Sequence, residues 1–199
     1  MKKFKINTPC VLFNLKEHLK IKKKLTSLIN TTKKDSLTTI DEYHSDLIHN
    51  LDFNYSTDFS REWVVFLLKY LNNYFQKISL NLGYQKCLIR NIWFQQYKNG
   101  GQHGWHTHGG NYTGVYYLNF SNKCAKTEIV DPFSQNKKIT INAVEGDVVI
   151  FPSYVIHRAP KQTNRSTKTI ISFNLDFDKP NQNVLNKILN LKSYDAIKR

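Results

Sequence analysis

The hydrophobic period of the chain changes near residue 85, and this change limits the folds that the chain can adopt. Before that point, apolar residues recur every three or four positions, which is the spacing of amphipathic helices. From Cys87 onward, β-branched and aromatic residues alternate with polar ones, which is the pattern of half-buried strands. Helices followed by many short strands predict an α+β, mainly β domain, with the N-terminal helices packed on one sheet of a sandwich or barrel.

Two N-terminal segments carry helical patterns. The second, residues 59–84, has apolar residues at i, i+3, i+4 and i+7; we expect Asp58 or Ser60 to cap its start and Gly83 to end it. The first, residues 14–30, predicts an amphipathic helix that covers a sheet. Its apolar positions, expected near one helical face, are Leu15, Leu19, Leu25, Leu28 and Ile29.

The segment between these helices, residues 31–54, is polar and acidic, with only a weak helical tendency around Tyr43, Leu47 and Ile48. We expect a long connection there. Residues 184–194 predict a short closing helix. At 199 residues the chain is long enough for one domain with a substantial core. We divide it into a helical support region, a β core and a helical tail, which are residues 1–84, 85–178 and 179–199.

Six segments of the second half carry the strand pattern. Turn-forming residues separate them, for example at Gly100, Gly109 and Gly146. The predicted strands lie within residues 87–97, 113–120, 127–130, 137–144, 147–152 and 168–178.

The formal net charge is +14, but the charged residues are segregated along the chain. Residues 1–40 hold ten lysines and two acids, whereas residues 41–60 hold five acids and no lysine or arginine. A solvated helix face in a lysine-rich protein explains this pattern most simply. Binding of nucleic acid or another anionic partner is possible but not favoured, because no zinc-finger or helix-turn-helix pattern accompanies the charge.

Three scattered cysteines, Cys10, Cys87 and Cys124, give neither a disulfide framework nor a Cys-x-x-Cys metal pair. The basic start of the chain lacks the continuous apolar stretch of a secretory signal. Nowhere are there about 18 uninterrupted apolar residues, as a membrane-spanning helix requires. We therefore expect a cytoplasmic protein with no membrane partner.

Three histidines form a candidate metal site. His106 and His108 are two positions apart, and on a strand residues i and i+2 point to the same face. A metal held for catalysis needs a third ligand, and His157, which follows His108 by 49 positions, can supply it from a later strand. His103 is expected in the loop at the mouth of the site, where Trp93, Gln95 and Trp105 are candidates to line the substrate entrance.

Residues 93–178 resemble the double-stranded β-helix dioxygenases that use Fe(II) and 2-oxoglutarate, within their prolyl-hydroxylase-like branch. The His-x-His form resembles that of a bacterial and phage-type group of these enzymes. The resemblance implies a jelly-roll, cupin-like fold and a hydroxylase that converts 2-oxoglutarate and dioxygen to succinate and CO₂. The substrate that it hydroxylates is not encoded in any pattern; a prolyl or other amino-acid residue follows only from the resemblance.

The same resemblance implies which residues bind the cosubstrate. Tyr117 matches a tyrosine that contacts the distal carboxylate of 2-oxoglutarate, and Tyr97 matches another tyrosine beside it. Lys168 occupies the place of the basic residue that anchors this carboxylate, with Ser172 four positions later on the same strand face. Arg165 is the alternative anchor.

Two departures from the family pattern keep alternatives open. His108 stands where relatives usually have Asp or Glu, and Lys168 stands where many have Arg. A cupin-like, three-histidine metalloenzyme that does not use 2-oxoglutarate would account for His108 directly. A non-catalytic β-sandwich whose basic N-terminal helix binds an anionic partner is the third interpretation.

Overall fold

Two antiparallel sheets form the centre of the computed structural model, which describes residues 8–40, 45–134 and 136–191. The elements in chain order are β1 (Val11–Asn14), α1 (His18–Thr31), β2 (Asp35–Ile40), β3 (Ser45–Leu51), the 3₁₀ helix η1 (Phe53–Tyr55), α2 (Glu62–Asn81), β4 (Tyr84–Tyr97), β5 (His103–His106), β6 (Tyr112–Asn119), β7 (Glu128–Val130), β8 (Lys138–Thr140), β9 (Asp147–Pro152), β10 (His157–Ala159), β11 (Lys168–Pro180) and α3 (Gln182–Leu191).

The larger sheet has the strand order β1-β9-β6-β11-β4-β3-β2, and the smaller sheet has the order β5-β10-β7-β8. Strands distant in sequence are therefore neighbours, and the long β4–β11 pairing runs from Lys168 opposite Tyr97 to Pro180 opposite Tyr84. This is the arrangement of a double-stranded β-helix, and it confirms the predicted fold class.

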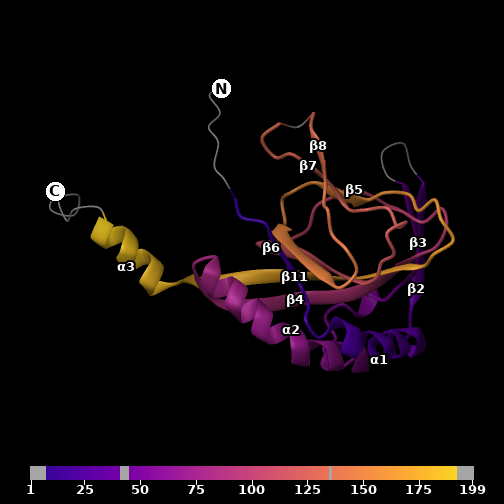
Figure 1. Cartoon of the computed structure of the whole chain (residues 1–199), viewed down its shortest axis with the longest axis horizontal. Coiled ribbons are helices and arrows are strands. Elements are labelled where there is room, and N and C mark those ends of the chain that lie inside the picture. The colour runs from indigo at the N-terminus through magenta and orange to yellow at the C-terminus, as the bar shows by residue number, and fades with distance from the viewer. Residues whose placement is uncertain (1–7, 41–44, 135, 192–199) are drawn as a thin grey trace.

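The helices α1 and α2 cover one face of the larger sheet, and the smaller sheet lies on the other side (Figure 1). One apolar core fills the space between the helices and the larger sheet, and a second core lies between the two sheets. The larger sheet is thus buried on both faces, which explains why β6 and β9 are almost continuously buried instead of alternating. The last helix, α3, projects beyond the end of β11 (Figure 1).

Gly114 on β6 is required by this double burial. A Cβ at that position would lie 2.3 Å from a ring carbon of Phe173 and 2.8 Å from the Val149 carbonyl oxygen. Both neighbours belong to the strands that flank β6, β11 and β9. A side chain therefore cannot be added without moving a central part of the sheet.

The first predicted helix is confirmed as α1, but its buried face differs from the prediction at one position. Leu19 is 86% exposed, whereas Ile21 and Leu25 are buried. Because the helix begins at His18, whose side chain is itself buried, the inward face runs through His18, Ile21 and Leu25. Leu19 lies about 100° around the helix from His18 and points to solvent.

The long connection predicted for residues 31–54 is wrong, because this segment forms the hairpin β2–β3. The pairing places Leu37 opposite Ile48 and joins β3 to β4 through Asn50 and Gln96. Leu47 and Ile48, which suggested a weak helix, therefore lie on β3, between β4 and the edge strand β2. Tyr43 is outside the described residues.

The second helix is confirmed as α2, with a different N-terminal cap. Arg61 occupies the cap position and makes no side-chain capping bond, while Asp58 instead accepts the Ser60 amide at 2.9 Å. The chain leaves the helix at Gly83, whose φ of +89° is a left-handed conformation that favours glycine. The prediction for Gly83 is confirmed.

Each of the six predicted strand segments contains a strand, namely β4, β6, β7, β8, β9 and β11. The support region also gives β1, β2 and β3 to the larger sheet, so residues 8–40 and 45–84 are not only helical. The domain boundaries themselves remain predictions. The closing helix is present as α3, and residues 192–194 lie outside the described part. Among the described helices, none has the length and hydropathy needed to cross a membrane.

Candidate active site

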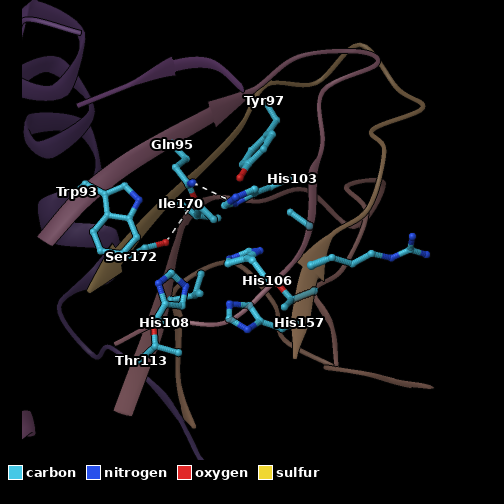
Figure 2. A pocket seen from close by; sticks show the side chains of 14 residues that line it. Trp93, Gln95, Tyr97, His103, His106, His108, Thr113, His157, Ile170 and Ser172 are labelled. Atoms are coloured by element: carbon cyan, nitrogen blue, oxygen red, sulfur yellow. Dashed lines mark hydrogen bonds between the residues drawn. The ribbon is translucent and has the colours of Figure 1, made fainter. Parts of the chain in front are cut away.

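His106, His108 and His157 converge on one point between the two sheets (Figure 2). One ring nitrogen from each lies within 4.8 Å of the other two, a spacing from which all three can bind a single metal ion. Strand pairing causes part of this convergence, because His157 at the start of β10 pairs directly with His106 at the end of β5. The predicted convergence of the three histidines is confirmed.

The strand-parity argument that placed His108 beside His106 was wrong. β5 ends at His106, so His108 lies beyond the strand and the i, i+2 rule does not apply to it. Instead, the His108 amide donates to the Ser153 carbonyl at 3.1 Å, which fixes the segment after β5 against the end of β9. The imidazoles of His106 and His108 meet nearly at right angles, with ring centroids 4.9 Å apart.

Backbone carbonyls orient two of the three imidazoles. His106 Nδ1 lies 2.7 Å from the Gly104 oxygen, and His157 Nδ1 lies 2.9 Å from the Val155 oxygen. Because a carbonyl only accepts, each Nδ1 carries the proton and each Nε2 has the lone pair that a metal needs. Burial, together with the neighbouring His106, lowers the pKa of His108 and of His157 to about 3. Both rings are therefore neutral at physiological pH, as ligation requires.

The floor of the pocket is a ladder of side chains from β4 and β11. Strand register places Trp93 opposite Ser172, Gln95 opposite Ile170 and Tyr97 opposite Lys168. Alternate residues of each strand share one face, so the three rungs all point between the sheets. The Trp93–Ser172 rung, the Gln95–Ile170 rung and Tyr97 line the same pocket as the histidines.

Lys168 is completely buried at the deep end of this ladder. Its ammonium donates to the Ala125 carbonyl at 2.8 Å and lies 5.5 Å from the centre of the Tyr97 ring. Within the described residues, no carboxylate forms a salt bridge with it, and burial lowers its pKa to about 8. The Tyr97 hydroxyl is buried and has no hydrogen-bond partner in the described part of the chain. A cation and a hydroxyl in this state suit a bound carboxylate.

The other predicted cosubstrate residues occupy different places. The Tyr117 hydroxyl donates to Thr127 Oγ1 at 2.8 Å, and Thr127 lines the pocket. Ser172 Oγ donates to Gln95 Oε1 at 3.4 Å, two rungs from Lys168, or roughly 13 Å along the strand. Arg165 is exposed in the loop before β11. The structure therefore brings Lys168 and Tyr97 together and places Ser172 nearer the histidines.

Several residues of the site had weak or no sequence signals. Gln95 shares the strand parity of Trp93 and Tyr97, and it is almost fully buried. Thr127 follows no motif and is brought in by β7. The Trp105 ring instead lies under the Arg158 guanidinium, 4.5 Å from its centre.

Comparison with known proteins shows which family the β core resembles. Residues 91–174 match a family model described as "Putative 2OG-Fe(II) oxygenase". Over these residues the chain is similar to the 2OG-Fe(II) oxygenases. The matched stretch runs from the beginning of the β4 ladder to Asn174 on β11, and it contains all three histidines. No curated protein sequence matches the chain.

Solved structures support the same fold. The chain is similar to an oxidoreductase of the 2OG-Fe(II) oxygenase family from Burkholderia pseudomallei, with a TM-score of 0.67, 10% identity, and coverage of 86% of this chain and 87% of that one. A Pseudomonas putida prolyl-4-hydroxylase has a TM-score of 0.57 and 13% identity, with coverage of 83% of this chain and 91% of that one. A Trichoplax adhaerens prolyl hydroxylase in complex with a peptide fragment has a TM-score of 0.59 and 14% identity, with coverage of 92% of this chain and 87% of that one.

The matched family uses Fe(II) and 2-oxoglutarate, and the residues of the pocket and of the Lys168–Tyr97 rung fit both. Imidazole nitrogens are suitable ligands for iron, and three of them on one side leave coordination positions open. At the end of the ladder, the buried ammonium of Lys168 forms no salt bridge with a carboxylate of the described residues, and a dicarboxylate would supply the balancing anion.

Proposed function

We propose that His106, His108 and His157 hold the Fe(II) of this oxygenase and that Lys168 binds the distal carboxylate of 2-oxoglutarate. Lys168 is the observation that carries the proposal. A completely buried lysine without a carboxylate partner in the described residues is costly, and Lys168 stands opposite Tyr97, which lines the same pocket as the three histidines.

Bound iron and 2-oxoglutarate supply the oxidising chemistry, in which 2-oxoglutarate, dioxygen and a C–H bond become succinate, CO₂ and a hydroxylated product. The protein contributes orientation. The Lys168 ammonium and the Tyr97 hydroxyl fix one end of the cosubstrate, so that its 2-oxo acid end is directed toward the histidines. The pocket walls Val115 and Ile170 exclude water from the space between these two ends.

For the substrate, we propose a prolyl or other amino-acid residue. Two of the similar structures are described as prolyl hydroxylases, and one of these contains a peptide fragment. We also propose a cytoplasmic location, which is consistent with the free thiols of Cys10, Cys87 and Cys124.

A second candidate is a three-histidine metalloenzyme that does not use 2-oxoglutarate. His108 favours it, because this residue makes the ligand set entirely neutral. Succinate formation distinguishes the two candidates. The iron-loaded protein should convert 2-oxoglutarate to succinate, and His157→Ala should abolish the conversion. If iron is bound and no succinate forms with any of a panel of peptides and amino acids, the second candidate is preferred.

A further inference from the structure

A carboxylate outside the ligand set reaches the wall of the metal pocket. Asp46, on β3, accepts the Gly104 amide on Oδ1 at 2.8 Å, and the same oxygen lies 3.9 Å from His103 Nε2. Paired backbone hydrogen bonds between Leu47 and Gln102, 2.9 and 3.0 Å long, hold β3 against the chain just before β5. Asp46 is therefore placed by the hairpin that the sequence did not predict.

Both contacts of Asp46 lead to the same metal-ligand candidate. Gly104, whose amide Asp46 accepts, offers its carbonyl to His106 Nδ1 at 2.7 Å. His103 lies face to face with His106, with ring centroids 3.8 Å apart and an interplanar angle of 20°. The orientation of the His106 ring is thus determined from its edge by Gly104 and from its face by His103, and Asp46 contacts both residues.

A chain of hydrogen bonds fixes the orientation of His103 (Figure 2). Ser172 Oγ donates to Gln95 Oε1 at 3.4 Å, which directs the amide nitrogen of Gln95 toward His103. Gln95 Nε2 lies 3.4 Å from His103 Nδ1, so this ring nitrogen accepts. The proton of a neutral His103 then lies on Nε2, which faces Asp46 at a distance typical of an ion pair or of a contact bridged by one water.

A three-histidine site has an electrostatic need that a carboxylate-containing one lacks. Neutral imidazoles leave both positive charges of a divalent metal uncompensated by the ligands. Carboxylates that bond to ligating or neighbouring histidines raise ligand basicity and hold ring orientation, and losing one typically costs about 10- to 100-fold in metal affinity. Asp46 has the position for this role, since its side chain is only 14% exposed.

We propose that Asp46 is a positioning residue of the metal site, which aligns His106 through His103 and the Gly104 peptide and supplies the negative charge that the ligand set lacks. This inference rests on the proposed metal site but not on the identity of the cosubstrate. It predicts that the charge of Asp46 acts through His103, because His103 contacts both the carboxylate and the face of the His106 ring.

Titration of the metal-free protein with Co²⁺, followed by its visible absorption, tests the proposal without any turnover. Asp46→Asn keeps the acceptor for the Gly104 amide and removes the charge, so it should fold normally and bind Co²⁺ about 10- to 100-fold more weakly, with a shifted spectrum. Ser45→Ala is the matched control, because Ser45 neighbours Asp46 and its hydroxyl accepts the Gln102 side-chain amide at 2.5 Å. Its Co²⁺ affinity should equal that of the wild type.

His103→Phe keeps a ring against His106 but removes the contact with Asp46. It should cost less affinity in the Asp46→Asn background than in the wild type, since the two residues act in series. Wild-type affinity and spectrum in Asp46→Asn, or simple additivity of the two substitutions, would overturn the proposal. No Co²⁺ binding by the wild type would overturn both this proposal and the metal site. Weakened Co²⁺ binding in Asp46→Asn, together with no succinate from the wild type, would support the role of Asp46 and reject only the cosubstrate.

Discussion

Lys168 stands directly opposite Tyr97 on the β4–β11 ladder, and neither side chain has any exposed surface. Burial raises the pKa of the Tyr97 hydroxyl further above its ordinary value, so this group remains a neutral donor. One rung therefore holds a cation beside a hydroxyl donor that lines the pocket. In the proposed complex, the far carboxylate of 2-oxoglutarate lies on this rung and its 2-oxo acid end points toward the histidines.

Replacing Lys168 by methionine should abolish cosubstrate binding while the protein stays folded. The variant leaves the distal carboxylate buried without its cation, a loss of about 2–5 kcal/mol, so the Kd for 2-oxoglutarate should rise at least about 30-fold. Isothermal titration of the metal-loaded protein measures this change. The free energy of unfolding without ligand should not fall, because the substitution removes a buried, unpaired charge. Arg165→Met is the matched control and should bind 2-oxoglutarate like the wild type. If Arg165→Met alone lost binding, Arg165 would be the anchor.

Cosubstrate affinity should also depend on the charge of Lys168. Its pKa is lowered to about 8 from 10.5 by burial, so above pH 8 the free protein loses the proton that carboxylate binding requires. The Kd for 2-oxoglutarate should therefore increase about tenfold per pH unit above pH 8. Without ligand, the free energy of unfolding should change in the opposite sense and increase with pH. Between pH 8 and 10.5 the unfolded chain binds more protons at this group, so wild-type stability should rise with pH relative to Lys168→Met. A flat binding profile would contradict this assignment.

The fold was largely predictable because the strand segments have a strong period of two. Lys168 and Ser172 were predicted to share a strand face, and Tyr97 was chosen from the family pattern; the β4–β11 register then places Lys168 and Tyr97 on one rung. Strand parity cannot show how far along a face a bound molecule extends. That is why Ser172 was expected at the same carboxylate as Lys168 but lies two rungs away, beside Gln95.

The parts that could not be predicted depend on tertiary contacts. The sequence of the β2–β3 hairpin has little hydrophobic alternation, and its pairing with β4 involves few residues, so its local sequence resembles a connection. Asp46 was missed with it. His108 was placed at the site by strand geometry that it does not have, and its actual position depends on the bond of its amide to Ser153. Such contacts leave no periodic signal in the sequence.

Two glycines provide a matched test of the packing between β9, β6 and β11. Gly114→Ala should destabilise the protein by about 1–3 kcal/mol, because the new methyl group would collide with Phe173 and the Val149 carbonyl. Gly109→Ala should be close to neutral, since no atom of the described residues lies within 4 Å of its added Cβ. Urea unfolding of the two variants measures the difference. Equal stabilities would show that the central strands are not packed as described.

The substitution His108→Asp distinguishes the two proposed kinds of chemistry. In a 2-oxoglutarate oxygenase, Asp fills the position that a carboxylate occupies in relatives, so the variant should retain iron and form succinate at a measurable rate. In a three-histidine enzyme that does not use 2-oxoglutarate, the added negative charge changes the metal and should cost most of the activity. Iron content and succinate, measured together, give the answer. Iron retained without succinate in both proteins would favour the second kind.

Anaerobic titration of the Fe(II)-loaded protein with 2-oxoglutarate tests the central claim most directly, because it requires the three histidines and Lys168 to act on the same molecule. The account predicts a weak visible absorption band that grows with 2-oxoglutarate and saturates at one equivalent. The band should be absent in His157→Ala, which cannot hold the metal, and in Lys168→Met, which cannot hold the cosubstrate at the same concentration. An iron-loaded wild type that shows no band, or a Lys168→Met protein that gives the wild-type titration curve, would contradict the account.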